Sequence, residues 1–182
     1  MNKIVYLNII LTTSLNTFSQ TKHAEKTQIS KMDKFTSKTG SIIKYIDYSL
    51  TNIKGVYDVS ETKVRKIIAG ESVGYFFQIS KEGKYDTKNA SIEYSDLLEV
   101  IKAIGKLKQE SVQDIMSDGN YLENKFVTDD GFQIGYYISN EKLNWYIKLE
   151  KYGSGNTIFL RDLSEIEMIL IDAKNKVDTL KQ

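Results

Sequence analysis

Apolar residues recur at alternate positions, in short runs, over the part of the chain after residue 40. The runs are rich in β-branched and aromatic residues and are separated by Gly, Asn, Asp and Ser, which is the pattern of strands joined by turns. The period changes to three and four residues over 95–114, which predicts a helix with one apolar stripe. The strands predicted before this helix are 41–50, 63–69, 72–81 and 90–94.

The same order of elements returns after a polar break at 117–120. The Asp129-Asp130-Gly131 segment is typical of a hairpin turn, since glycine adopts positive φ at low cost. A second helix is predicted from Ser164 to the C-terminus, because the start of this segment matches a capping box and an apolar stripe follows it. The strands predicted in this half are 121–128, 132–139, 144–152 and 157–161.

The two halves can be aligned with each other. Residues 75–83 match 145–153 in their alternating apolar positions and in the lysine and glycine near the end. We interpret this as an internal duplication within an α+β fold: two tandem units, 40–116 and 117–182, each a four-stranded antiparallel meander followed by a helix, packed as one globular domain. Identity between the halves is low, and the alternative is a chance resemblance between two amphipathic meanders.

The beginning of the chain has the parts of a secretory signal peptide in their usual order. Lys3 supplies a positive charge, residues 4–15 are uncharged and mostly apolar, and small residues precede a cleavage point after Ser19. Residues 20–39 are polar and predict a solvated leader. We therefore expect an exported protein, periplasmic or secreted, without a transmembrane segment. The alternative is a cytoplasmic protein in which residues 3–11 form a core strand.

Charge and composition narrow the range of functions. Removing residues 1–19 takes away Lys3 and no acidic residue, which leaves 24 basic and 24 acidic residues. A neutral chain has no summed field to attract phosphate backbones, so a nucleic-acid partner is not favoured. The chain has no cysteine, and His23, its one histidine, lies in the leader. A thiolate nucleophile and a Ser-His-Asp triad are thereby excluded from the folded region, and we expect no enzyme, cofactor or metal.

Two alternative functions place specific demands on the fold. A single-stranded nucleic-acid binder needs lysines gathered on one aromatic-bearing face, and a carboxylate-based hydrolase needs two acids converging in a cleft. The candidate lysines are Lys63, Lys66, Lys148 and Lys151. The candidate acids are the pairs Asp129 with Asp130 and Glu165 with Glu167, although a hairpin and a helix start also account for them.

Aromatic residues supply the candidate binding surface. The chain has 12 tyrosines, and neighbouring aromatics such as Trp145 and Tyr146 must point to opposite sides of a strand. Not all of them fit in one core. We therefore predict that Tyr137, Trp145 and Tyr146 contact a protein or another component of the envelope. The alternative is that both sides of the strands are packed, one under the helices and one between the halves.

Two resemblances concern the overall plan. The leader and the stretches DKFTSKTGSIIKYIDY (33–48) and LENKFVTDDGFQIGYY (122–137) are similar to uncharacterised small exported bacterial proteins. The repeated meander followed by a helix resembles the whirly and Pur-alpha class of single-stranded nucleic-acid binders and, less closely, the tandem sheet-plus-helix beta-lactamase inhibitor proteins. This likeness covers 41–182 in outline, supplies no specific motif, and implies no binding residue.

Overall fold

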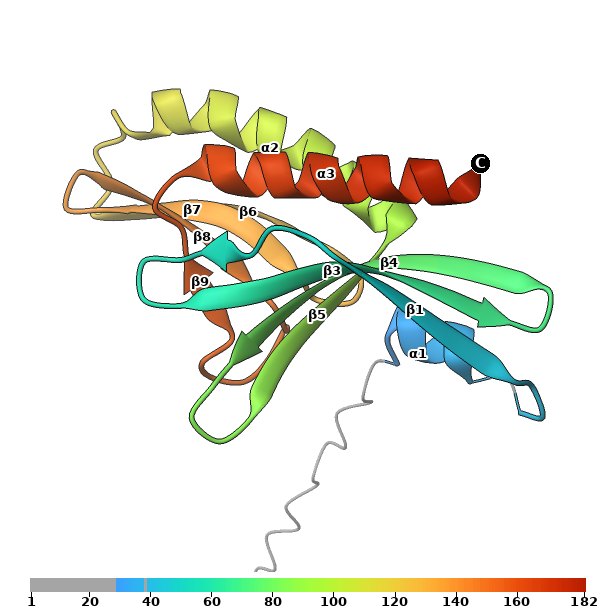
Figure 1. Ribbon diagram of the computed structural model, residues 1–182. Helices are drawn as coiled ribbons and strands as arrows, with labels where there is room; N and C mark the ends of the chain where they lie inside the picture. Colours follow the sequence, from blue (N-terminus) through green and yellow to red (C-terminus); the bar gives the residue numbers. More distant parts are fainter. Residues whose placement is uncertain (1–28, 38) are drawn as a thin grey trace, which may run out of the picture.

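The computed structural model describes residues 29–37 and 39–182, which form an α+β arrangement of two antiparallel sheets and three helices (Figure 1). The first sheet has the strand order β1-β3-β4-β5, with β2 paired to the beginning of β3, and the second has the order β6-β7-β8-β9. The strands of the first sheet are β1 (Ile43–Ser49), β2 (Ile53–Lys54), β3 (Val59–Ala69), β4 (Ser72–Glu82) and β5 (Thr87–Glu93). The remaining elements are α1 (Lys31–Thr36), α2 (Tyr94–Asp114), β6 (Tyr121–Val127), β7 (Gln133–Ser139), β8 (Lys142–Lys148), β9 (Thr157–Phe159) and α3 (Leu163–Lys181).

The prediction of an α+β protein with antiparallel sheets is confirmed, and the strand boundaries differ from those expected most at β3, β5 and β8. Strand β3 begins at Val59, because Val59 and Ser60 pair with β2 and the pairing with β4 starts at Glu61. Strand β8 covers Lys142–Lys148 instead of 144–152. Its start is set by the tight turn at Asn140 and Glu141, both at positive φ, which brings Lys142 opposite Ser139.

Helices α2 and α3 lie side by side on the same side of the two sheets (Figure 1). Helix α2 follows the first sheet in the chain but packs more extensively on β6 and β7 of the second, while α3 follows the second sheet and packs on β2 and β3 of the first. The apolar residues of both helices and both sheets form one continuous core. The expected arrangement of two tandem meander-plus-helix units is therefore met only roughly, because each helix extends across to the other sheet.

The opposite face of the first sheet is partly covered by α1 (Figure 1). The Phe35 ring meets the buried Phe76 ring edge-on, with 6.1 Å between centroids. The Lys31 ammonium lies 2.6 Å from an Asp96 oxygen, and the Lys31 backbone N–H donates to Asp130. Residues 31–36 were expected in a solvated leader, and the structure shows instead a short helix packed on the sheet. One ring and one cation are enough to attach this otherwise polar segment.

The two sheets are joined where β2 approaches β9. Gly55 forms a bridge with Leu160, and the Val56 N–H donates to the Phe159 carbonyl at 2.8 Å. The Lys81 ammonium reaches across the junction, donating to the Thr157 carbonyl at 2.6 Å and lying 2.7 Å from an Asp58 oxygen. This connection brings the loop between β2 and β3 to the edge of the second sheet.

Candidate binding face of the second sheet

Strand pairing sorts the aromatic residues of the second sheet onto two faces. Tyr136 lies opposite Trp145, while Tyr137 lies opposite Asn144 and Tyr146 opposite Gly135. Side chains alternate along each strand, so Tyr136 and Trp145 share one face and Tyr137 and Tyr146 share the other. The three predicted binding residues are therefore divided between two faces.

Trp145 belongs to the face that α2 covers. Its ring lies 4.9 Å from the ring of the fully buried Tyr136, and it packs against the common core. The Tyr136 hydroxyl donates to Asp114 near the end of α2 at 2.5 Å and accepts from Asn124 at 3.2 Å. The structure therefore places Trp145 with the core residues, away from the face that holds Tyr137 and Tyr146. The strand register causes this separation.

No helix of residues 29–37 and 39–182 covers the opposite face of the second sheet, which carries a continuous series of rings that we call the aromatic row. Tyr137 stacks on Tyr121 at 6.1 Å and contacts Tyr146 and Phe159 at 6.3 and 6.5 Å. Phe159 meets Tyr57, from the loop between β2 and β3, at 6.2 Å. The row thus crosses all four strands and continues onto the first half of the chain. Its members are Tyr121, Tyr137, Tyr146, Phe159 and Tyr57.

A shallow hollow of about 230 Å³ lies beside the aromatic row. Its floor is Tyr146, which is only 6% exposed and donates a hydrogen bond from its hydroxyl to Glu123. Burial, followed by this bond, raises the pKa of Tyr146 well above its usual range, and the same bond lowers the pKa of Glu123. The residues lining the hollow are Glu123, Lys125, Gln133, Tyr137, Tyr146, Lys148, Thr157 and Phe159.

The cations of the hollow differ in their partners. Lys125 lies 3.2 Å from Glu123 and is paired with it. The Lys148 ammonium forms no ion pair or hydrogen bond within residues 29–37 and 39–182. Glu123 accepts hydrogen bonds from Tyr146 and Lys125 and also feels the charge of Lys148. The hollow therefore offers a positive charge without a hydrogen-bond partner among the described residues, next to aromatic surface and the amide of Gln133. This combination suits a carboxylate with apolar neighbours.

The candidate acids of a hydrolase do not converge. Asp129 and Asp130 both contact Lys31, the first as an ion pair and the second through the Lys31 backbone N–H. Glu165 accepts from the Lys54 backbone N–H, and Glu167 pairs with Lys108 on α2. Where carboxyl pKa shifts are resolved among the described residues, each is downward, as for Asp47, which hydrogen bonds from Arg65 and Lys63 hold at about 2. A general acid requires the opposite direction.

The candidate lysines of a nucleic-acid binder are also dispersed. Lys63 pairs with Asp47, and Lys66, three residues further along β3, lies over the Tyr75 ring on the other face of the first sheet. Lys148 lines the hollow of the second sheet, and Lys151 covers Tyr152 in the following loop. The structure does not bring these four ammonium groups together on one face.

Several members of the binding face could not be selected from the sequence. Tyr121, Phe159 and Tyr57 come from separate segments, and only the pairing between strands shows that their rings meet. Tyr121 did carry a signal, because it begins the strand predicted over 121–128. The expected role of His23 as a tail residue, and the predicted signal peptide, lie outside the described residues.

Within the described part of the chain, no three His, Cys, Asp or Glu side chains are grouped so that they could hold a metal ion. Neither of the long helices, α2 and α3, has the length of apolar sequence needed to cross a bilayer, nor does any other helix among the described residues. No model of a known protein family matches the chain, and no curated protein matches it either. The inference about function therefore starts from the geometry of the binding face.

Proposed function

We propose that this protein is a non-catalytic binding module whose second sheet holds a protein partner on its helix-free face. The observation that carries the proposal is the aromatic row, which crosses four strands beside a hollow lined by Lys148, a lysine without a hydrogen bond in the described part of the chain. Rigid aromatic side chains give a large contact area at a low cost in conformational entropy, and they are enriched where partners bind. Tyr137 and Tyr146, predicted from the sequence, are both part of this face.

The size and charge of the hollow indicate what the partner presents. A volume of about 230 Å³ is below the range of roughly 300–1,000 Å³ that is usual for small-molecule sites. It fits one side chain, and Lys148 favours an acidic one. We therefore expect an aspartate or glutamate of the partner to enter the hollow, with apolar residues beside it on Tyr121 and Tyr57. Tyr121 is 58% exposed and is free to make such a contact.

Export is part of the same proposal. The order of charged, apolar and small residues in 1–19 supports a signal peptide, and the partner would then be an envelope or secreted protein. Mass spectrometry of the mature N-terminus in the native host tests this point. A chain beginning at Gln20 supports export, and an intact Met1 contradicts it.

The tandem-unit interpretation is likewise a proposal. It is supported by the order of the elements, since each antiparallel sheet is followed in the chain by one long helix. It also accounts for the matching patterns of 75–83 and 145–153. In this view the second unit specialised in binding, while the face of the first sheet that corresponds to the binding face became covered in part by α1.

The binding proposal is tested with two matched double variants. Lys148→Glu with Tyr121→Ser changes the binding face, and Lys44→Glu with Tyr85→Ser makes the same changes at exposed positions outside the second sheet. We expect the first variant to lose the envelope proteins that co-purify with the wild-type chain, and the second to retain them. Circular dichroism confirms that both are folded. Retention of the same proteins by both variants would exclude this face as the binding site.

A further inference from the structure

Packing within the described chain does not explain why residue 105 is a glycine. It lies exposed in the middle of α2, where glycine costs about 1 kcal/mol relative to alanine. Its φ is not positive, and an added Cβ would meet no atom within 4 Å. Neither backbone conformation nor a close neighbour within the described chain therefore explains the glycine. A close approach from outside the chain would explain it.

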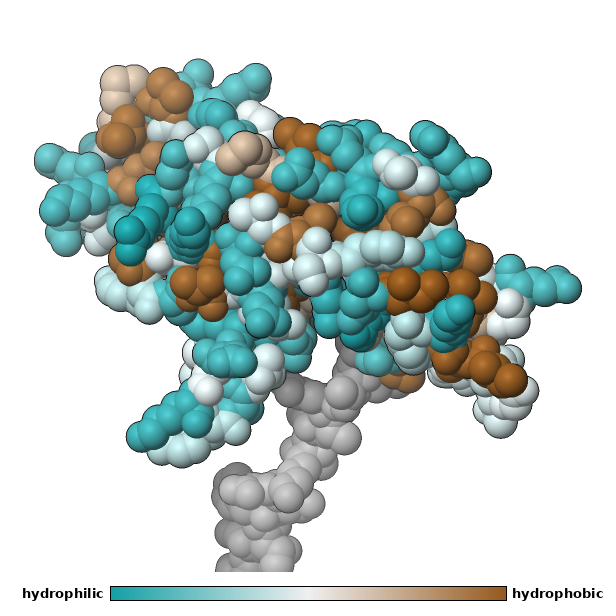
Figure 2. Space-filling model, in the orientation of Figure 1, coloured by the Kyte–Doolittle hydropathy of each residue, from teal (hydrophilic) through white to brown (hydrophobic). Residues whose placement is uncertain are grey.

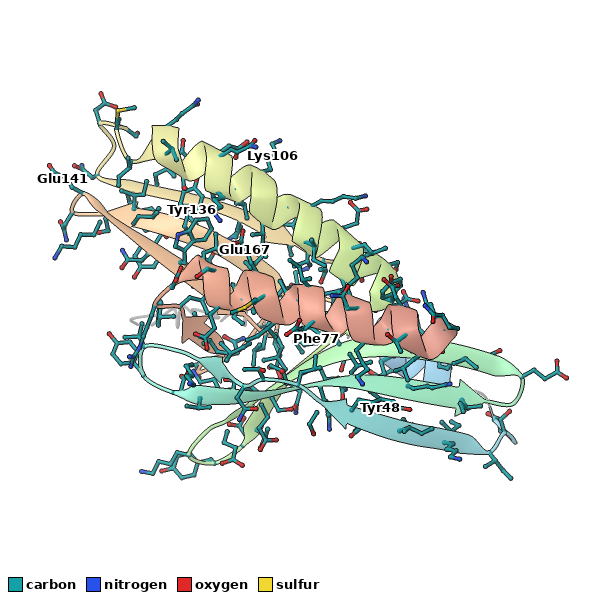
Figure 3. All side chains as sticks on the ribbon, turned by 45° about the horizontal axis from the view of Figure 1, so that its top comes forward. Tyr48, Phe77, Lys106, Tyr136, Glu141 and Glu167 are labelled. Atoms are coloured by element: carbon teal, nitrogen blue, oxygen red, sulfur yellow. The ribbon has the colours of Figure 1, made fainter. Side chains whose placement is uncertain are left out.

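Gly105 lies on the floor of an apolar groove between α2 and α3. The groove has a volume of about 260 Å³ and is open to solvent. Figure 3 looks onto α2 and α3, with Lys106 of α2 and Glu167 of α3 labelled. On its α3 side, Ile171 is 47% exposed and Met168 is 62% exposed. Large apolar side chains exposed to water at this position do not stabilise the fold by burial. Together they form an exposed apolar strip along the helix pair. The residues lining the groove are Ile101, Ile104, Gly105, Glu167, Leu170 and Ile171.

Other apolar side chains are exposed on this molecule, and they differ from the groove. One group is at the end of α2 and consists of Val112, Ile115 and Met116. Another is where β1 meets the β3–β4 hairpin and consists of Ile42 and Val73. Figure 2 shows hydrophobic residues, in brown, at opposite ends of the molecule. Among the described residues, the helix pair combines exposed apolar residues, a hollow and a glycine that packing within the chain does not explain.

The two helices carry opposite charges beside the groove. On α2, Lys102 and Lys106 are highly exposed, and their ion pairs are with Glu99 and Glu110 of the same helix, which contribute little at the surface. On α3, Asp172 is exposed and has no ion pair or hydrogen bond among the described residues. Both helices also carry charges of the other sign, such as Glu99 on α2 and Lys174 on α3, but Lys102 and Asp172 give the exposed face one basic and one acidic position that a second copy can match.

We propose that the α2–α3 face is a dimer interface in which two copies of the chain pack about a two-fold axis parallel to the helices. The helices are antiparallel: Lys108 lies beside Glu167 and Tyr94 beside Asp178. Such an axis keeps each residue at its level along the helices and places α2 of one copy over α3 of the other. Lys102 then faces Asp172 of the second copy.

The same arrangement accounts for Gly105. In this dimer, Gly105 of one copy lies opposite the segment between Met168 and Ile171 of the other copy. The Met168 and Ile171 side chains of each copy then enter the groove of the other. Close approach of the helices at this point requires a residue without a side chain. The dimer therefore gives the glycine, the groove and the exposed apolar residues a common cause.

The area available reaches the lower end of the range for specific interfaces, which is roughly 600–1,000 Å² per partner. A helix of about 20 residues is about 30 Å long, and two adjacent helices span roughly 20 Å. This gives roughly 600 Å² of projected area on each copy, and the side-chain relief increases the contact surface. Stable interfaces bury about 800 Å² per partner. The dimer does not involve the second sheet's binding face, which lies on the other side of the molecule and stays open.

Sedimentation equilibrium of the purified chain tests this proposal through charge reversal. We expect a reversible monomer–dimer equilibrium, a dissociation constant raised at least about tenfold by Lys102→Glu or Asp172→Lys alone, and recovery in the double variant. Lys142→Glu, an exposed change away from the helices, is the control. Thermal melting followed by circular dichroism shows that each variant is folded. A monomer at every soluble concentration, or a dimer insensitive to both single reversals, would overturn the proposal.

A second variant fills the groove directly. Gly105→Gln adds a side chain in open space and improves helix propensity, so the monomer remains folded. We expect it to shift the equilibrium to monomer. A dimer of undiminished affinity in this variant would also contradict the interface. Loss of the dimer in these variants with retention of the envelope partner would separate this proposal from the binding function.

Discussion

The hydroxyl of Tyr136 is buried between a carboxylate and an amide. It donates to Asp114 and accepts from Asn124, tying β7 to the end of α2 and to β6. Burial, followed by the bond to Asp114, raises the pKa of Tyr136 to about 12 from 10.0. The folded state therefore favours the neutral phenol. Its contribution to the free energy of unfolding is complete below pH 10 and is lost as the pH rises toward 12.

Replacing Tyr136 with phenylalanine tests this linkage. Near neutral pH we expect Tyr136→Phe to lower the free energy of unfolding by about 1–3 kcal/mol, because Asp114 and Asn124 lose a buried partner. Above pH 10 the difference from wild type should shrink by about 1 kcal/mol for each pH unit, since only the wild type ionises this phenol on unfolding. Urea unfolding at a series of pH values measures both effects. Tyr85→Phe, at an exposed position, is the control, and a difference that stays constant with pH would contradict the assignment.

Replacing Gly135 or Gly105 with alanine should change the free energy of unfolding in opposite directions. A Cβ at Gly135 would lie 2.3 Å from the Asn124 carbonyl oxygen and 2.8 Å from the Lys125 Cα, both backbone atoms of β6. We expect Gly135→Ala to cost about 2 kcal/mol or more, because β6 must move away from β7. Gly105→Ala should instead stabilise the monomer by about 1 kcal/mol. Urea unfolding of dilute protein measures the free energy of unfolding of each variant. If both substitutions stabilise or both destabilise the protein, the space around the added Cβ does not determine their effect.

At the scale of elements, the sequence pattern predicted the helices and strands that are long enough to show a hydrophobic period. The hairpins and both long helices follow from apolar alternation and from the three- and four-residue stripe. The helix α1 and the strand β2 were not predicted, because six and two residues are too short to show a period. The composition of the aromatic row was predicted in part. Alternation along one strand shows which of its residues share a face, as for the strands that hold Tyr137 and Tyr146. Which rings from different strands contact each other depends on the register of strand pairing.

Helix α1 is held by tertiary contacts, because a six-residue helix is not stable alone. The Phe35 ring covers Phe76 and lies about 3 Å from where a Cβ on Gly74 would be, so it seals this end of the first sheet. We expect Phe35→Ala to cost about 1–2 kcal/mol and to expose residues 30–40 to proteolysis. Lys34→Ala, on the exposed side of the helix, is the control. Equal protection of both variants would show that the ring does not hold the helix.

At the scale of the whole molecule, the crossing of the helices makes the two halves depend on each other. Helix α2 belongs to the first half in sequence, yet β6 and β7 supply much of the surface that its apolar stripe contacts. Helix α3 belongs to the second half and covers β2 and β3. Lys81 and Gly55 add polar and backbone contacts across the junction. A half without its complement leaves an apolar helix face and a sheet face in water.

We therefore expect residues 40–116 expressed alone to lack a fixed tertiary structure, and residues 117–182 likewise. An equimolar mixture of the two fragments should recover the near-ultraviolet circular dichroism of the whole chain, because the missing surfaces are restored even without the covalent link. Dispersed amide signals in an NMR spectrum of either fragment alone would contradict this expectation. Such a result would mean that each sheet is stabilised by its own helix, with the contacts between halves added to units that were already stable.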